Sequence, residues 1–267
     1  MPVPPSAADP PPPALWLAEP PHAGGASRGA AAVAEALALD EALLEEAHEG
    51  LRRARVVRVW MAPDPVVVVG SSSRVEDEVD LAACGAAGVA VLRRPSGGAT
   101  VILGPGCLMW SVIEPFPLGV PAVERIHDAM LGPLAAGLSE AGPTVARLGT
   151  SDLVLSGACD EEAKKVSGNA LRVRRHGVLY HGTLLDSFDI GLAGRLLRHP
   201  PREPGYRRRR PHEAFLANLG LGRQRLERLV RRAFGAEGDF PAAEVPHDRV
   251  ARLLRERYAL PAWTHRL

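Results

Sequence analysis

The stretch from Arg93 to Cys107 combines residue types that could bind an anionic ligand. Two arginines, a proline and a serine precede Gly97 and Gly98, and β-branched residues follow them. The glycines let the backbone approach a ligand closely, their amides can bind an anion, and the arginines supply positive charge. Neither standard nucleotide fingerprint, GxxxxGK(S/T) or GxGxxG after a strand, is present. Taken alone, the pattern indicates only a hairpin turn with two exposed arginines.

A second stretch, from Lys164 to Leu185, carries the only two lysines of the chain. The other 30 of the 32 basic residues are arginine, so the composition is strongly biased against lysine. Lys164 and Lys165 are the exceptions to this bias. An ammonium group is compact and fits against one carbonyl or phosphate oxygen where a planar guanidinium would clash. Lys165 directly precedes Val-Ser-Gly-Asn and is the better candidate for such a task. The alternative interpretation is a solvated pair on an edge strand.

This second stretch is predicted to form a β-hairpin with its polar residues on one face. If residues 175–177 form a three-residue loop with Gly177 at the position of positive φ, Leu171 faces His181 and Asn169 faces Thr183. Because side chains alternate along a strand, that face would carry Lys165, Ser167, Asn169, His181 and Thr183, beside the apolar Leu171, Val173 and Leu179. Such a wall suits a molecule with a charged head and an aliphatic tail. A two-residue loop would instead place Lys165 on the face opposite His181.

The remaining sequence predicts the elements of an α+β fold. Helical spacing predicts helices over residues 30–53, 80–87 and 121–141. Apolar and β-branched runs predict strands over residues 56–61, 66–69, 89–93, 100–103, 108–113 and 151–156, with a short edge strand over 15–17. Later helices are predicted over residues 190–197, 211–219, 223–233 and 245–257. We therefore expect a mixed or antiparallel sheet with flanking helices and a C-terminal helical segment.

We expect three regions along the chain. Residues 1–28, rich in proline and alanine, predict a partly disordered leader; residues 29–198 form the main domain, and residues 199–267 a basic helical segment packed on it. The net charge is +1, yet from Ala193 onward 17 arginines stand against 8 acidic residues. Few aromatic residues lie between these arginines. We therefore expect the run from Arg207 to Arg210 to be a solvated surface or one for an acidic partner, with no nucleic acid bound.

Several other classes of protein are disfavoured. Cys84, Cys107 and Cys159 are odd in number and lack paired spacing, so we expect no disulfide framework, no metal site, and a reducing compartment. No secretory signal is recognisable, and no apolar run reaches the roughly 18 residues of a membrane span. These features favour a cytoplasmic protein that does not enter a membrane, and we expect a monomer.

The order and spacing of the two motifs resemble the biotin/lipoate protein ligase superfamily, most of all lipoate–protein ligase A. That family carries Arg-Arg-x-Ser-Gly-Gly-Gly, a strand with Lys-(Ile/Val)-(Ala/Ser)-Gly-(Ser/Asn)-Ala, and a closing His-Gly-Thr-Leu-Leu. The similar segments here are residues 93–99, 165–170 and 181–185. Ser151-Asp152-Leu153 resembles the family's Asn-Asp-Leu, and the helix end from Leu39 to Leu44 resembles that of its opening helix.

The resemblance implies the fold of the biotin/lipoyl ligase catalytic domain and a reaction in which a carboxylic acid and ATP form an acyl-adenylate that a carrier lysine attacks. Lys165 would be catalytic, stabilising charge on the acyl carbonyl and the phosphate. It further implies ATP and Mg²⁺ as cofactors, lipoate or octanoate as the acid, and a lipoyl domain of a 2-oxoacid dehydrogenase complex or a glycine cleavage H-like protein as acceptor. The residues implied in acyl or adenylate binding are Arg93, Arg94, Ser96, Gly97, Gly98, Ala99, Asp152, Ser167, Gly168, Asn169, Ala170, His181, Gly182 and Thr183.

Departures from the family pattern leave other interpretations open. Ala99 replaces the third glycine, and Ile102-Leu103 replaces a frequent His-Asp, so one polar contact toward the nucleotide or metal is missing. Gly104-Pro105-Gly106 resembles octanoyl transferases that draw on an acyl carrier protein or another lipoyl domain, and Cys107 is the candidate nucleophile of that alternative. The cysteine that one related transferase group uses corresponds to Ala146. A non-catalytic acyl-binding protein is the third interpretation, and His181 is equally compatible with a satisfied core histidine.

Overall fold

The structure, a computed structural model, describes residues 14–18, 29–157, 159 and 162–267. Within them, a mixed eight-stranded sheet has the order β11-β1-β2-β6-β10-β9-β8-β7. β1 is parallel to both of its neighbours, and the strands from β2 onward in this order are antiparallel. These strands are β1 (Ala14–Leu17), β2 (Arg55–Met61), β6 (Cys107–Pro115), β7 (Val145–Leu148), β8 (Asp152–Leu155), β9 (Lys164–Arg174), β10 (Gly177–Leu185) and β11 (Gly238–Asp239). Most of the predicted leader lies outside the described residues. Its strand β1 is not an edge strand, because β11 flanks it.

A smaller sheet carries the first motif. Its order is β4-β3-β5, with β4 (Ala90–Arg93) parallel and β5 (Val101–Leu103) antiparallel to β3 (Val66–Val69). All four valines of β3 are buried, as the unbroken β-branched run predicts. The glycine-containing loop therefore connects two strands that both pair with β3, which fixes where it starts and ends.

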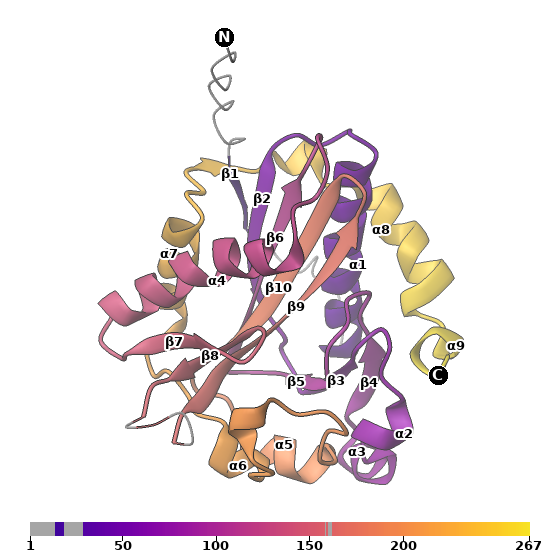
Figure 1. Cartoon of the computed structure of the whole chain (residues 1–267). Helices are drawn as coiled ribbons and strands as arrows, with labels where there is room; N and C mark the ends of the chain where they lie inside the picture. The colour runs from indigo at the N-terminus through magenta and orange to yellow at the C-terminus, as the bar shows by residue number, and fades with distance from the viewer. Residues whose placement is uncertain (1–13, 19–28, 158, 160–161) are drawn as a thin grey trace.

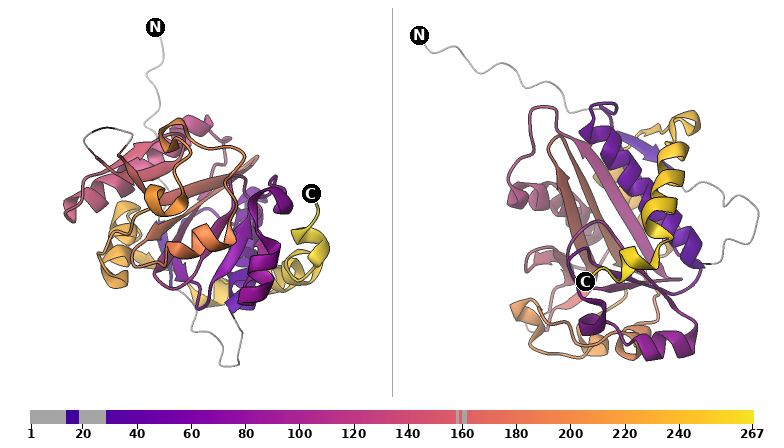
Figure 2. Two further views of the ribbon diagram at one scale, coloured as in Figure 1. Left: turned by 90° about the horizontal axis from the view of Figure 1, so that it is seen from below. Right: turned by 90° about the vertical axis from the view of Figure 1, so that its right-hand side faces the viewer.

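Helices cover both faces of the large sheet (Figures 1 and 2). α1 and the C-terminal helices lie on one face, and α4 and α7 lie on the other. The longer helices are α1 (Gly29–His48), α3 (Leu81–Ala87), α4 (Val123–Glu140), α7 (Arg223–Ala233) and α8 (His247–Leu253). The short ones are α2 (Val75–Glu78), α5 (Gly191–Leu196), α6 (His212–Phe215), α9 (Pro261–Thr264), the 3₁₀ turns Gly205–Arg207 and Ala242–Glu244, and the π turn Leu254–Tyr258.

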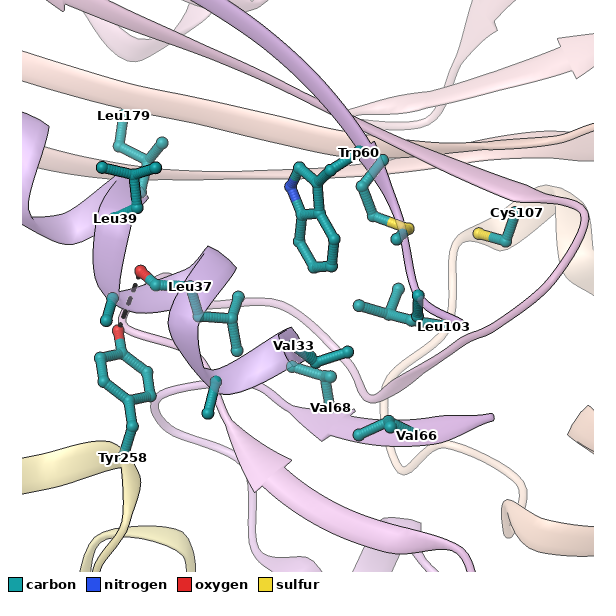
Figure 3. Close-up of a cluster of buried hydrophobic side chains, with 14 of the residues drawn as sticks. Val33, Leu37, Leu39, Trp60, Val66, Val68, Leu103, Cys107, Leu179 and Tyr258 are labelled. Carbon is teal, nitrogen blue, oxygen red and sulfur yellow. Dashed lines mark hydrogen bonds between the residues drawn. The ribbon is translucent and has the colours of Figure 1, made fainter. Parts of the chain in front are cut away.

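Two large hydrophobic cores result from this layering, and a small third cluster contains Val154, Ala163, Tyr206 and Phe215. The first surrounds α1, whose many alanines let it approach both sheets, and includes Trp60, Val68 and Leu103 (Figure 3). The second packs α4 and α7 against Trp110 and Tyr180 of the large sheet. Residues of α8 belong to the first core and residues of α7 to the second, so the segment after residue 199 packs into the same cores as the preceding chain.

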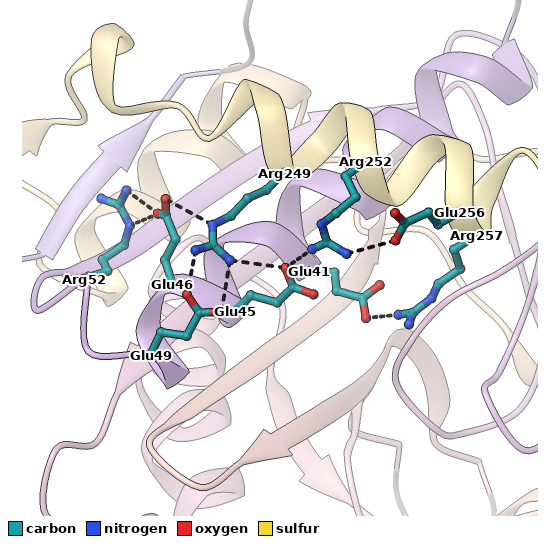
Figure 4. A network of polar contacts seen from close by, with 9 residues as sticks. All are labelled: Glu41, Glu45, Glu46, Glu49, Arg52, Arg249, Arg252, Glu256 and Arg257. Atoms are coloured by element: carbon teal, nitrogen blue, oxygen red, sulfur yellow. Dashed lines mark hydrogen bonds and ion pairs between the residues drawn. The ribbon is translucent and has the colours of Figure 1, made fainter.

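Ion pairs hold α8 and the π turn along α1 (Figure 4). The participating residues are Glu41, Glu45, Glu46 and Glu49 of α1 and the loop after it, with Arg52, Arg249, Arg252 and Arg257. The contact between Arg249 and Glu49 is 2.6 Å long. Part of the arginine excess after Ala193 is therefore neutralised within the protein and does not form a free basic surface.

The β9–β10 hairpin differs from its predicted register. Gly177 pairs with Arg174 and His181 pairs with Ala170, so the loop has two residues, and the three-residue loop was wrong. Gly177 lies in the strand, where an added Cβ would be 3.1 Å from the Cβ of Ala47 on α1. The glycine therefore serves helix–sheet packing at this position and not the φ requirement of a turn.

A β-bulge compensates for this change of register. β9 pairs Gly168 with Asp152 but Lys165 with Val154, so one extra residue lies between them on β9. A bulge shifts the alternation of side chains by one residue. Val166 accordingly packs in the core of α4 and α7, and Lys165 turns to the face that carries His181. Lys165 and His181 therefore share a face as expected, but for a different reason. Asn169 pairs with Gly182 and Leu171 pairs with Tyr180, so both lie on the opposite face and that part of the prediction was wrong.

Candidate active site

A pocket of about 370 Å³ is lined by α1, both sheets, the loop after β4 and residues 202–204. A hollow of about 110 Å³ adjoins it and shares Lys165, Gly168 and Thr183 with it. Arg94 and Gly98 of the first motif and Lys165 and His181 of the second line the larger pocket together. The fold therefore brings two segments separated by about sixty residues to one cavity.

One part of the larger pocket is apolar. Leu37 of α1 and Trp60 of β2 contribute to it, and both belong to the core around α1 (Figure 3). Val68, Leu103 and Met109 also belong to this lining. Ligand pockets are typically apolar with a few convergent polar groups, and this one can accept an aliphatic chain.

Lys165 and Asp152 form an ion pair in the pocket lining. The Nζ atom of Lys165 lies 2.8 Å from Oδ1 of Asp152, and the lysine side chain is 24% exposed. Tyr206 donates its hydroxyl to Oδ2 of the same carboxylate at 2.8 Å. Gly168 makes room for the amine, since a Cβ there would lie 2.8 Å from Nζ. The ammonium group is thus held at the junction of the two cavities.

Arg94 shapes the loop from inside. It donates to the carbonyl oxygens of Gly97 at 2.6 Å and Ala99 at 2.9 Å, and its Nε donates to Ser96 Oγ at 3.1 Å. Burial lowers the pKa of Arg94 to about 10, which leaves it charged at neutral pH. The loop turns at Gly98, whose φ of 87° favours glycine. Arg94 is consequently committed to the loop backbone, and it exposes little charge to a ligand.

His181 connects this loop with α1. Its Nε2 atom lies 2.5 Å from Ser96 Oγ, and its Nδ1 atom lies 3.7 Å from Oδ2 of Asp40. Asp40 is 1% exposed, and Arg58 and Ser111 bind its other oxygen. His181 therefore lines the pocket and is also bonded to the protein, so the two interpretations of its role are not exclusive.

The other residues of the second motif support β9 and β10. Asn169 donates to the carbonyl oxygen of Ser151 at 2.7 Å, and Ser167 donates to Asn169 Oδ1 at 3.1 Å. Gly182 is needed here, because a Cβ would lie 1.7 Å from that oxygen. Thr183 exchanges long contacts with the backbone of Gly168 and lines both cavities. Ala170 also lines the larger pocket, whereas Ser167 is fully buried and is absent from its lining.

Comparison with known proteins assigns the family. Residues 32–220 match the family model described as the lipoyl protein ligase A/B catalytic domain. The chain belongs to this family. A lipoate-protein ligase A from Aeropyrum pernix is 35% identical over 60% of the chain, which spans 56% of that relative's length. Octanoyltransferases LipM are also similar: that of Carboxydothermus hydrogenoformans at 28% identity over 87% of this chain and 94% of its own, and that of Symbiobacterium thermophilum at 33% over 76% and 80%.

Solved structures share the fold. The bipartite lipoate protein ligase of Thermoplasma acidophilum, studied with its E2 lipoyl domain, has a TM-score of 0.75 at 20% identity, covering 96% of both chains. A lipoate-protein ligase A bound with ATP has a TM-score of 0.74 at 20% identity, covering 96% of this chain and 98% of its own. The expected α+β fold of the ligase catalytic domain is confirmed. As a member of this family, the chain is an enzyme of the ligase or acyltransferase type.

Arg93, the first arginine of the family motif, lies away from the pocket. It is fully buried and donates to the carbonyl oxygens of Gly70 at 2.6 Å, Ser73 at 2.8 Å and Thr264 at 2.9 Å. Its expected contact with acyl or adenylate is therefore replaced by an internal role. Arg93 is the last residue of β4 and Arg94 begins the loop, so their adjacency in sequence did not show that the two side chains have different surroundings.

The cysteines do not support a thiol nucleophile in this pocket. Cys107 is fully buried, and burial raises its pKa to about 12, so the reactive thiolate is scarce at neutral pH. Cys84 is also buried, and Cys159 is exposed. Among the described residues, no cysteine lines either cavity. Ala146, where a transferase cysteine was considered, is an exposed residue of β7.

Several pocket residues were not found from the sequence. Asp40 lies in a helix rich in acidic residues, where its burial gives no local signal. Trp60 belongs to a strand whose apolar pattern predicts only a core position. Tyr206, which supports the pocket residue Asp152 without lining either cavity, comes from the C-terminal segment. Arg202 and Glu203 line the pocket from a loop without any motif. All of these are brought to the site by tertiary contacts that a linear pattern does not contain.

The described residues contain no group of three or more His, Cys, Asp or Glu side chains placed to hold a metal ion. Ile102 and Leu103, which replace the family's His-Asp, are buried in the core around α1. None of the described helices is long and apolar enough to cross a membrane.

Proposed function

We propose that this enzyme joins lipoate or octanoate to a lysine of a lipoyl carrier domain through an acyl-adenylate. The observation that carries the proposal is the placement of the Lys165 ammonium group at the junction of an apolar pocket and a second cavity. A carboxylate at that point would have its charge beside Nζ and its chain among Leu37, Trp60 and Leu103.

Binding and chemistry would rest on different parts of the acid. Six buried methylenes contribute roughly 5 kcal/mol at ~0.8 kcal/mol each, and a charge-assisted hydrogen bond from Lys165 contributes about 1.5–3 kcal/mol. The tail therefore dominates affinity. The fixed ammonium group would act on charge that develops at the carbonyl and phosphate, where preorganised donors are most effective.

ATP supplies the activation of the carboxylate when it is bound. The residues fit this group, because Nζ of Lys165 and the loop of Gly97, Gly98 and Ala99 offer positive charge and amides near the pocket. Mg²⁺ is usually held by one or two carboxylates together with the phosphates of the substrate. Asp152 and Glu203 of the pocket lining would supply these carboxylates.

Adenylation is favoured over transfer through an enzyme thioester. An acyl-adenylate requires no protein nucleophile, which agrees with the absence of cysteine from the cavity lining among the described residues. The high pKa of Cys107 argues against the thioester alternative. The similarity to LipM leaves octanoyl transfer from an acyl carrier protein as the second candidate.

The test is an intact-mass assay of a lipoyl domain incubated with the enzyme. One arm contains lipoate or octanoate with and without MgATP, and another contains octanoyl acyl carrier protein without nucleotide. ATP-dependent acylation with pyrophosphate release, lost in Lys165→Ala, is the expected result. Acylation only from the acyl carrier protein would replace this proposal with transfer, and acid binding without turnover would indicate a non-catalytic protein. We further propose a cytoplasmic monomer whose acceptor is either a 2-oxoacid dehydrogenase lipoyl domain or a glycine cleavage H-like protein. Parallel assays of both acceptors test the choice of acceptor, and a sedimentation measurement tests the monomeric state.

A further inference from the structure

Ser96, His181 and Asp40 are arranged in series, from the loop through β10 to α1. The distances are 2.5 Å from Ser96 Oγ to His181 Nε2 and 3.7 Å from His181 Nδ1 to Asp40 Oδ2. This order is that of a nucleophile, a base and an orienting carboxylate. The arrangement therefore raises the question of whether Ser96 reacts or is only held.

Burial decides against a nucleophile. Ser96 has no exposed surface, and it is absent from the lining of both cavities. Its oxygen also accepts a hydrogen bond from Arg94 Nε at 3.1 Å, which ties up a lone pair. A serine in this position cannot meet a substrate carbonyl without rearrangement of the loop.

Asp40 determines which atoms donate and which accept hydrogen bonds between Asp40, His181 and Ser96. Burial alone would raise the pKa of Asp40, but the charge of Arg58 together with contacts from His181 and Ser111 outweighs it, so the pKa lies below its usual value. The ionised carboxylate favours a proton on Nδ1 of His181. Nε2 then accepts a hydrogen bond from the hydroxyl of Ser96. Oδ2 of Asp40 is buried and has no hydrogen-bond partner among the described residues, so the 3.7 Å approach of His181 Nδ1 is the contact that faces it.

We propose that Asp40 and His181 are positioning residues that hold the loop through Ser96. Ser96 and Arg94 together bind the segment in which Gly98 and Ala99 line the pocket. The proposal rests on the function proposed above, since the loop is taken to bind the acyl-adenylate. Its consequence is that His181 acts mainly through Ser96 and not through direct contact with the ligand.

A double-mutant cycle separates these two roles. The probe is octanoyl-sulfamoyl adenosine, a stable mimic of the acyl-adenylate, and Kd is measured by calorimetry for the wild type, Ser96→Ala, His181→Ala and the double variant. We expect each single variant to weaken binding about tenfold, the loss of one net hydrogen bond, and the double variant to be no weaker than either. Residues acting through one contact are non-additive in this way.

Conservative variants give a second, independent readout. Glutamine at position 181 can place its amide near Ser96, whereas asparagine can reach only toward Asp40. His181→Gln should therefore bind the mimic within about threefold of the wild type, and His181→Asn should resemble His181→Ala. Asp40→Asn should also weaken binding. Ser139→Ala, which loses comparable contacts with Val145 far from the pocket, should leave Kd unchanged.

Each remaining outcome is decisive. Normal binding by Ser96→Ala would show that binding does not depend on the Ser96 contact, and effects that multiply in the double variant would show that His181 acts independently of Ser96. Either result would overturn the inference. An acyl adduct on Ser96 in a mass spectrum after turnover would also overturn it. If the wild type itself fails to bind the mimic, the proposed function is wrong instead. Thermal unfolding of each variant without ligand shows whether the protein is folded at the assay temperature.

Discussion

The Nζ atom of Lys165 lies 2.8 Å from Oδ1 of Asp152 at the junction of the two cavities. This pairing holds the ammonium group in place before any ligand arrives, which is the condition for electrostatic catalysis. We predict that Lys165→Ala lowers kcat by about 10²–10³-fold, the range found for removal of one preorganised donor. Steady-state acylation of a lipoyl domain measures this.

Lys164 provides a matched control, because it is the adjacent lysine and is exposed. Lys164→Ala should retain activity within about twofold, as expected for an exposed surface substitution. Lys165→Arg should remain impaired, since a planar guanidinium does not occupy the space of a compact ammonium group. Equal losses in the two alanine variants would show that total charge matters and not the position of Nζ.

Tyr206 is predicted to support the same carboxylate. Burial raises the pKa of Tyr206 far above its usual value, with a further contribution from Asp152, so its hydroxyl stays a donor. Tyr206→Phe removes the 2.8 Å bond to Asp152 and should lower kcat roughly tenfold, the effect of about 1.4 kcal/mol. The control is Tyr180→Phe, which loses a 2.8 Å contact with His127 in the core of α4 and α7. If both variants lose stability but only Tyr206→Phe loses activity, the effect is specific to the site.

Gly168→Ala should separate activity from stability. The added Cβ would lie 2.8 Å from Nζ and Cε of Lys165, the mobile end of a side chain, so the fold can accommodate it while the amine must move. We expect a melting temperature close to that of the wild type and a clear loss of kcat. Gly132→Ala in α4, where no atom lies within 4 Å, is the control and should stabilise the helix by about 0.5–1 kcal/mol. A large fall in melting temperature for Gly168→Ala would contradict this account.

Long-range register limited what could be predicted about the site. Strand runs such as Val66–Val69 and the helix containing Leu37 were predictable because burial leaves a local pattern. The face of Lys165 depends on a bulge whose pairing partner, β8, is distant from the hairpin loop. Gly177 was ambiguous for the same reason, since its neighbour Ala47 belongs to another element.

Charge patterns were similarly incomplete without the fold. The acidic side of α1 and the arginines of α8 neutralise one another, although they are about 200 residues apart in sequence (Figure 4). Arg207 of the basic run is 5% exposed and stacks over Phe215 at 4.7 Å, while Arg209 remains exposed. Composition showed the excess of arginine but not which arginines are free.

Arg93 and Arg94 should differ in the property they affect. Arg93→Ala leaves the carbonyl oxygens of Gly70, Ser73 and Thr264 without their donor. We expect the free energy of unfolding to fall by about 3 kcal/mol or more, as for other broken buried networks. At a temperature where the variant is folded, Kd for the acid should stay near the wild-type value. Urea unfolding and calorimetric binding measure the two properties. Arg94→Ala releases the loop, so we expect it to weaken binding of the acid in addition to lowering stability.

Cys107 is predicted to be dispensable and chemically inert. With a pKa of about 12, about one thiol in a thousand is ionised at pH 9, and alkylation requires the thiolate. At pH 9, iodoacetamide should therefore label exposed Cys159 while Cys107 stays unlabelled until the protein is denatured. Peptide mass mapping measures both sites, and Cys107→Ala should acylate a lipoyl domain at the wild-type rate. Rapid native labelling of Cys107, or loss of acylation in a folded Cys107→Ala variant, would restore the thioester mechanism.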